Sequence, residues 1–192
     1  MKNLPKPIHY GLLLLIVGAI LGGLLVLVNS FTSVIIAANE IREVEPKLQA
    51  LAPECSRFEV ATDQISDLPD YVSKVFFGYE EEAVTVVIYW TETPAYGNLV
   101  MKELIAIDVA SNKILNVVIT SSILTSHGKD ADFVMYDNFF QNINVSTYAN
   151  QSLDDYSKND PEIISGATVS SLGVLQGVII ASMHYQNADW GF

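Results

Sequence analysis

The segment best suited to chemistry runs from Asp160 to Ser171 and contains the string Ser-Gly-Ala-Thr at residues 165–168. Ser165 and Thr168 are residue types that cap the N-termini of helices. Gly166 permits a positive φ or a close approach of the backbone. A helix start surrounded by small residues offers free N–H groups to an anion. The pattern therefore predicts either a simple capped helix or a site for an anionic group at the start of a helix.

A buried helix over residues 169–185 is expected to follow this segment. Apolar residues recur there at i, i+3, i+7 and i+11, which is typical of one face of a helix. The expected stripe consists of Leu172, Leu175, Ile179 and Met183, widened by Val174, Val178 and Ala181.

Strands are predicted over residues 84–89, 99–109 and 114–120, where β-branched and alternating residues are frequent. A turn over 93–98 and a short connection over 110–113 join them into an antiparallel meander. Such a sheet needs a helix or a second sheet on its apolar face. The fold class is therefore predicted to be α+β, with one antiparallel-sheet domain and packed helices. A helix is also expected over 40–51, with a kink or an end at Pro46. A polar loop is expected over 142–160. Two groups of aromatic residues complete the predictions. A short amphipathic helix should carry Phe133, Tyr136, Phe139 and Phe140, and core positions are expected for Tyr71, Phe76, Phe77 and Tyr79.

The N-terminal part of the chain is strongly apolar, and residues 10–39 contain no charged side chain. The run from Tyr10 to Val28 is close to the roughly 20 residues that span a bilayer. A cleaved signal peptide is the alternative, because Ala37-Ala38 resembles a cleavage site, but its apolar region would span only about 7–15 residues. We therefore predict a short cytoplasmic end and a transmembrane anchor over residues 1–38, followed by an outward-facing domain over 39–192.

Charge limits the classes of partner. The chain has 10 Lys+Arg and 22 Asp+Glu, a net charge of -12. This balance argues against nucleic acid as a partner, since binding to a phosphate backbone requires a basic face. Cys55 is the single cysteine, so the chain has no internal disulfide and no multi-cysteine metal site. We predict no metal site and no residues that would act as a complete catalytic centre.

The Ser-Gly-Ala-Thr-Val-Ser string at 165–170 resembles the flavinylation motif of the FMN-binding domain family. That family includes flavin-bearing components of two membrane assemblies, the Rnf ion-translocating electron transport complex and the sodium-pumping NADH:quinone reductase. The resemblance extends to the N-terminal membrane helix, the acidic outer domain and the place of the motif about 25 residues before the C-terminus. Asp160, with Glu162 as a nearer candidate, matches the acid that precedes the family motif.

The resemblance implies covalent FMN, joined to the Thr168 hydroxyl as a phosphoester by a dedicated FAD:protein FMN transferase. It further implies cofactor contacts from the residues around this threonine: Ser165, Gly166, Ala167, Ser170 and Ser171. Members also carry a threonine-containing loop near the flavin ring, which corresponds to residues 124–129. Thr125 and Gly128 match that loop, while its proline and leucine are absent. Thr125, His127 and Gly128 are thus implied to lie on the flavin side.

The function implied is that of an electron-carrying subunit of an Rnf-type ferredoxin:NAD oxidoreductase in a bacterial cytoplasmic membrane. Its partners would be the other membrane subunits, the flavin transferase and membrane lipid. Two alternatives stay open. One is a stand-alone anchored flavoprotein for extracellular electron transfer, and the other is a non-redox anchored assembly or sensor module in which Thr168 only caps a helix.

The topology can be tested directly. Lys2 and Lys6 precede the apolar run and no acid does, so the positive-inside rule places the N-terminus in the cytoplasm. The part that follows has 8 basic and 22 acidic residues, a net charge of -14. A reporter fused after Phe192 should therefore be active only on the outer side of the membrane. Activity of the same fusion in the cytoplasm would contradict the orientation.

Overall fold

The structure is a computed structural model that describes residues 6–65, 67–120, 139–157, 159–164 and 166–191. Contacts within the chain divide it into two units, residues 1–43 and residues 44–192. The sequence predicted a boundary between a membrane anchor and an outer domain at residues 38 and 39. A division by contacts does not test membrane insertion, so this boundary stays a prediction.

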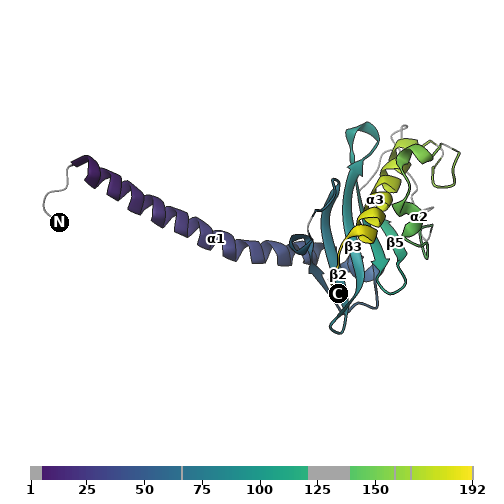
Figure 1. The fold of residues 1–192 in the computed structure, drawn as a ribbon, viewed down its shortest axis with the longest axis horizontal. Coiled ribbons are helices and arrows are strands. Elements are labelled where there is room, and N and C mark those ends of the chain that lie inside the picture. Colours follow the sequence, from purple (N-terminus) through teal and green to yellow (C-terminus); the bar gives the residue numbers. More distant parts are fainter. Residues whose placement is uncertain (1–5, 66, 121–138, 158, 165, 192) are drawn as a thin grey trace. The chain divides into compact units, whose positions relative to one another are not determined.

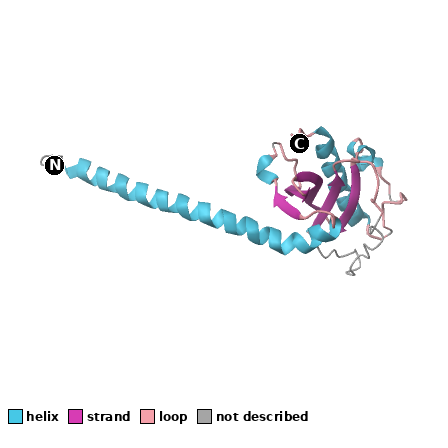
Figure 2. Cartoon of the chain, turned by 90° about the horizontal axis from the view of Figure 1, so that it is seen from below, coloured by secondary structure: helices cyan, strands magenta, loops and turns pink. Residues whose placement is uncertain are grey.

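Helix α1 (Lys6–Leu51) is a single element of 46 residues. It continues through Pro46, so the helix boundary considered at this residue is wrong. Figure 2 shows it as one long helix that follows the N-terminal end. Every side chain from Tyr10 to Val26 is exposed in its unit. Within the described part of the chain, no helix combines the length and the apolarity that a membrane crossing requires.

The second unit contains one five-stranded antiparallel sheet, which confirms the α+β class (Figure 1). The strand order follows the chain, so each strand pairs with the next one along the sequence. Residues with positive φ make two of the connecting turns possible, Glu81 between the second and third strands and Asn112 between the fourth and fifth. The strands are β1 (Arg57–Val60), β2 (Val72–Glu80), β3 (Ala83–Pro94), β4 (Val100–Asp108) and β5 (Lys113–Ile119).

Three of the strands were predicted, and β3, β4 and β5 confirm them. The ends of β4 and β5 shift by one residue, whereas β3 extends five residues beyond its predicted end and includes Thr93 and Pro94 of the predicted turn. The strands β1 and β2 were not predicted. The aromatic stretch now assigned to β2 was expected to be core, and Phe76 and Phe77 are buried there. Tyr71 is 44% exposed and is not part of that core.

The sheet is buried on both faces. Tyr89, paired with Val75 and Ile105, lies on the face that α3 covers, and all three are fully buried. Ile88 lies on the opposite face, where Phe76 is its cross-strand partner. The last turns of α1 supply buried side chains to the same unit at helical spacing: Val44, Leu48 and Leu51.

Helix α3 (Thr168–Asn187) confirms the predicted C-terminal helix and lies along the sheet in Figure 1. Most of the expected stripe is buried. Met183 is 42% exposed and is its one exposed member, whereas the buried members are Val174, Leu175, Val178, Ile179 and Ala181. Small residues that were not predicted complete the buried face: Ser170, Ser171, Gly173, Gly177 and Ser182.

Residues 142–160 were expected to be a polar loop without helices, which is wrong in part. A short helix α2 (Ser146–Ala149) and a 3-10 turn η4 (Leu153–Asp155) lie within them. Of the amphipathic helix expected around residues 133–140, Phe133 and Tyr136 lie outside the described residues. Phe140 is buried in a turn rather than in a helix.

Close contact between α3 and the sheet depends on two glycines one turn apart. A Cβ on Gly173 would lie 2.6 Å from the Pro94 carbonyl oxygen, and the Thr93 hydroxyl donates to the Gly173 carbonyl at 2.9 Å. A Cβ on Gly177 would overlap Glu103 Oε1 and lie 2.7 Å from Thr91 Oγ1. Neither position therefore has room for a side chain.

We expect Gly177→Ala to lower the free energy of unfolding by about 1–3 kcal/mol, because the added methyl group must displace the Glu103 carboxyl group or the helix. This loss should exceed the roughly 1 kcal/mol that alanine gains over glycine in a helix. Urea unfolding measures the difference. The control is Gln186→Ala, an exposed change on the same helix. A Gly177→Ala protein as stable as the wild type would show that the contact can relax without cost.

Candidate functional site

Thr168 is the first residue of α3 and is half-buried. The N-cap position belongs to Ala167, and no side chain caps the helix. The expectation that Thr168 caps it is therefore wrong. Among the described residues, none forms a hydrogen bond with the Thr168 hydroxyl, so this hydroxyl is available for another bond at the start of the helix.

The turn before α3 is held by Ser171. Its hydroxyl donates to the Ala167 carbonyl at 3.1 Å and accepts the Ile164 N–H at 3.0 Å. The Ala167 N–H donates to the Ile164 carbonyl at 3.0 Å, and Gly166 takes the positive φ of 84° that lets the chain reverse. Ser171 is fully buried, so its hydroxyl shapes the turn rather than facing an external ligand.

The other predicted site residues differ in placement. Ala167 and Ser170 are buried, and Gly166 is exposed. Within the described part of the chain, the Ser170 hydroxyl has no hydrogen-bond partner. The remaining predicted positions lie outside the described residues: Ser165, Thr125, His127 and Gly128. The structure thus brings together the attachment segment from Gly166 to Ser171 and does not test the loop assigned to the flavin ring.

The segment that carries Thr168 is poor in basic residues. From Asp130 to Phe192 the sequence contains one lysine, Lys158, and no arginine. Burial, with the carboxylates of Glu162, Asp155 and Asp160, raises the pKa of Tyr156 to about 12. The groups for binding an anion that this segment itself offers near Thr168 are the backbone N–H groups of the helix start.

A buried acid, Glu103, lies under the middle of α3 and was not recognised in the sequence. Its Oε1 accepts a hydrogen bond from the Thr91 hydroxyl at 2.9 Å, and Oε2 has no hydrogen-bond partner among the described residues. Burial raises the pKa of Glu103 well above its ordinary value, although the Thr91 hydrogen bond opposes the shift. The alternation along β4, in which Met101 and Ile105 face inward, could have placed Glu103 inside.

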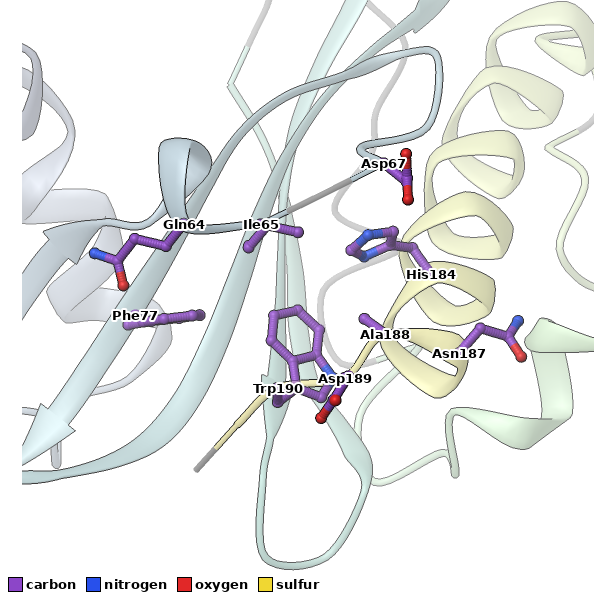
Figure 3. A pocket seen from close by; sticks show the side chains of 9 residues that line it. All are labelled: Gln64, Ile65, Asp67, Phe77, His184, Asn187, Ala188, Asp189 and Trp190. Atoms are coloured by element: carbon purple, nitrogen blue, oxygen red, sulfur yellow. The ribbon is translucent and has the colours of Figure 1, made fainter.

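A second polar region lies at the other end of α3. His184 Nδ1 is 2.8 Å from the Tyr89 hydroxyl, and Trp190 packs on both rings. No sequence pattern indicated this pairing, because Tyr89 precedes His184 by 95 positions. A cavity of about 320 Å³ opens beside them, with His184 reaching it from the helix (Figure 3). The lining residues are Gln64, Ile65, Asp67, Phe77, His184, Asn187, Ala188, Asp189 and Trp190.

The two regions are separate. Thr168 and His184 stand 16 positions apart on one helix, which corresponds to roughly 24 Å at 1.5 Å per residue. In the residues that the structure describes, no group of three or more His, Cys, Asp or Glu side chains could hold a metal ion. The chemistry available is therefore that of a hydroxyl at one end and of an aromatic and acidic cavity at the other.

Comparison with models of known protein families and with curated proteins found no match to this chain.

The buried acid predicts a particular pH dependence. Because burial raises the folded-state pKa of Glu103, its contribution to stability is complete below the unfolded pKa of about 4.3. The contribution is lost as pH rises from there through the folded-state pKa, by up to about 1.4 kcal/mol per pH unit. Glu103→Gln cannot titrate, so its free energy of unfolding should fall less between pH 5 and pH 7.

Urea unfolding of both proteins at pH 5, 6 and 7 measures the two slopes. Glu82→Gln, in the exposed β2–β3 turn, is the matched control and should keep the wild-type slope. If the free energy of unfolding of Glu103→Gln changes with pH as that of the wild type does, the pKa of Glu103 in the folded protein is the same as in the unfolded chain.

Proposed function

We propose that the chain is a membrane-anchored flavoprotein that carries FMN as a phosphoester on Thr168 and relays electrons within an Rnf-type complex. One observation carries the proposal: Thr168 is the half-buried first residue of α3, within the Ser-Gly-Ala-Thr string, and its hydroxyl has no hydrogen bond among the described residues. A threonine needed only for capping would lie one position earlier and bond to the helix backbone.

The local backbone supports attachment of a phosphate at this position. The first N–H groups of a helix lack partners within it and point toward its N-terminal end. A phosphate on Thr168 would lie beside them and gain roughly 0.3–1 kcal/mol from the helix dipole. Ser171 and Gly166 hold the preceding turn, so the hydroxyl is presented from a fixed backbone.

The shortage of basic residues favours a covalent link over reversible binding. Reversible phosphate sites commonly use arginine or lysine, which form charge-assisted hydrogen bonds. From Asp130 to the C-terminus Lys158 is the one such residue in the sequence, and the acids Asp160 and Glu162 precede Thr168 by eight and six positions. A phosphoester would retain the cofactor without such contacts.

The proposed anchor is the apolar part of α1. Residues 10–28 carry no charge and belong to one helix, and the side chains from Tyr10 to Val26 are exposed in their unit. Exposed apolar surface of this extent is typical of a segment covered by lipid or by another protein. An anchor would restrict the flavin to the plane in which its electron partners lie, with the acidic domain on the outer side of a bacterial membrane.

FMN, when bound, would supply one- and two-electron redox chemistry. The chain's own residues would hold and orient its phosphate. A stand-alone anchored flavoprotein shares these features and differs only in lacking partner subunits, so copurification separates the two. The non-redox module, in which Thr168 caps the helix, is disfavoured because Ala167 occupies the cap position.

Thr168→Val should abolish covalent FMN and leave the fold intact, because valine matches threonine in volume but cannot form a phosphoester. Each variant is expressed with the flavin transferase, and intact mass and flavin fluorescence after denaturation are measured. Thr147→Val removes an exposed threonine elsewhere and should retain full flavin content. Circular dichroism checks that both variants are folded.

Two results would count against the proposal. Covalent FMN retained in Thr168→Val would move the attachment to another hydroxyl in the segment. A wild-type chain that gains no mass in the presence of an active transferase would leave the non-redox module as the better explanation.

A further inference from the structure

The cavity at the C-terminal end of α3 has features that the proposed attachment at Thr168 does not use. It lies between the segment around Gln64 and Asp67, strand β2 and the tail after α3 (Figure 3). Its volume of about 320 Å³ falls at the lower end of the range for small-molecule sites.

Aromatic rings form one side of this cavity. The Trp190 ring centroid is 6.0 Å from that of Phe77, with the two planes at 70°. Its indole N–H donates to the Tyr185 carbonyl at 2.9 Å, and its ring packs against Tyr89 and His184. The indole is therefore held in one orientation, and the face of such a ring attracts cations.

The cavity is lined by acidic side chains and by no lysine or arginine among the described residues. The nine described residues that line it include the carboxylates of Asp67 and Asp189. Gln64 and Asn187 add amide oxygens that can accept hydrogen bonds. Asp67 has a positive φ of 58°, a strained conformation for a non-glycine residue.

The His184 imidazole lies at the same cavity and is held by two contacts. Its Nδ1 is 2.8 Å from the Tyr89 hydroxyl, and burial raises the pKa of that phenol. Its ring packs edge-on against Trp190, with the two centroids 5.8 Å apart. His184 therefore adds a polar ring at a fixed position in the cavity wall.

We propose that this cavity binds a small organic cation with a guanidinium group, stacked on Trp190 and hydrogen-bonded to Asp67 and Asp189. A guanidinium group is planar, stacks on aromatic rings and donates in pairs to carboxylates, whereas an ammonium group is a compact and strongly hydrated charge. The net charge of -12 raises the local concentration of any cation near the domain. The site is independent of flavin attachment, since it lies at the opposite end of α3.

Agmatine is a suitable probe, because it carries a guanidinium group and a primary amine. Calorimetric titration of the full chain in a non-ionic detergent should give saturable binding. Putrescine, which has two amines and no guanidinium, should bind about tenfold more weakly or less. N-butylurea, a neutral planar analogue, should not bind measurably.

Binding can be placed in the cavity by variants. Asp67→Asn and Asp189→Asn should each weaken agmatine about tenfold, as expected for loss of one charge-assisted hydrogen bond. Asp154→Asn removes the same charge at an exposed position of η4 and should leave the affinity unchanged. In a Trp90→Phe chain made without the flavin transferase, agmatine should change the fluorescence of Trp190, which is then the remaining tryptophan.

Three results would overturn the proposal. The first is equal affinity for agmatine and putrescine, which would remove the guanidinium assignment. The second is equal weakening by Asp154→Asn, which would show attraction by net charge alone. The third is an absence of saturable binding at millimolar agmatine in a folded protein. None of these results bears on FMN attachment, which is read from intact mass.

Discussion

The contact between α3 and the sheet at Gly173 and Gly177 is the constraint on which the rest of the domain depends. Without side chains at these positions the helix backbone lies against Thr93, Thr91 and Glu103. The contact brings polar groups into the interior, so each must find a partner or stay neutral. Thr93 donates to a helix carbonyl, and burial raises the pKa of Glu103, which favours its neutral form. Small residues thus set the separation of the layers, and the hydrogen bonds that they permit fix the helix along its axis.

Fixing the helix places both of its ends. At the N-terminal end, the position of Ser171 determines the turn that presents Thr168. At the other end, His184 meets Tyr89, and the chain then turns so that Trp190 covers the aromatic cluster. A shift of α3 by one residue would rotate its residues by about 100° and remove both arrangements. Both regions therefore depend on the same position of α3 along the sheet, although they are distant from each other.

Local patterns made much of this fold predictable. Alternation predicted β3, β4 and β5, and helical spacing predicted α3 within two residues at each end. Strand β2 was missed because Phe76 and Phe77 are buried on opposite faces, which hides a two-residue alternation. Strand β1 has four residues, too few for a clear pattern. The buried face of α3 was largely predicted, but the part formed by Gly173 and Gly177 was missed because the prediction rested on apolar side chains. The pairing of Tyr89 with His184 joins distant segments, so no local pattern could indicate it. Thr168 was identified from its motif and was expected at the start of a helix, whereas the lack of a side-chain cap on α3 could be seen only in the structure.

The hydrogen bonds of Ser171 affect the order in which a mature protein would be made. They join the turn before α3 to the helix itself, so the backbone around Thr168 takes its shape only after the helix has formed. An enzyme that modifies Thr168 would therefore meet a folded surface rather than an extended peptide. Folding of the domain would come first and cofactor loading second, which would keep flavin from being attached to chains that have failed to fold.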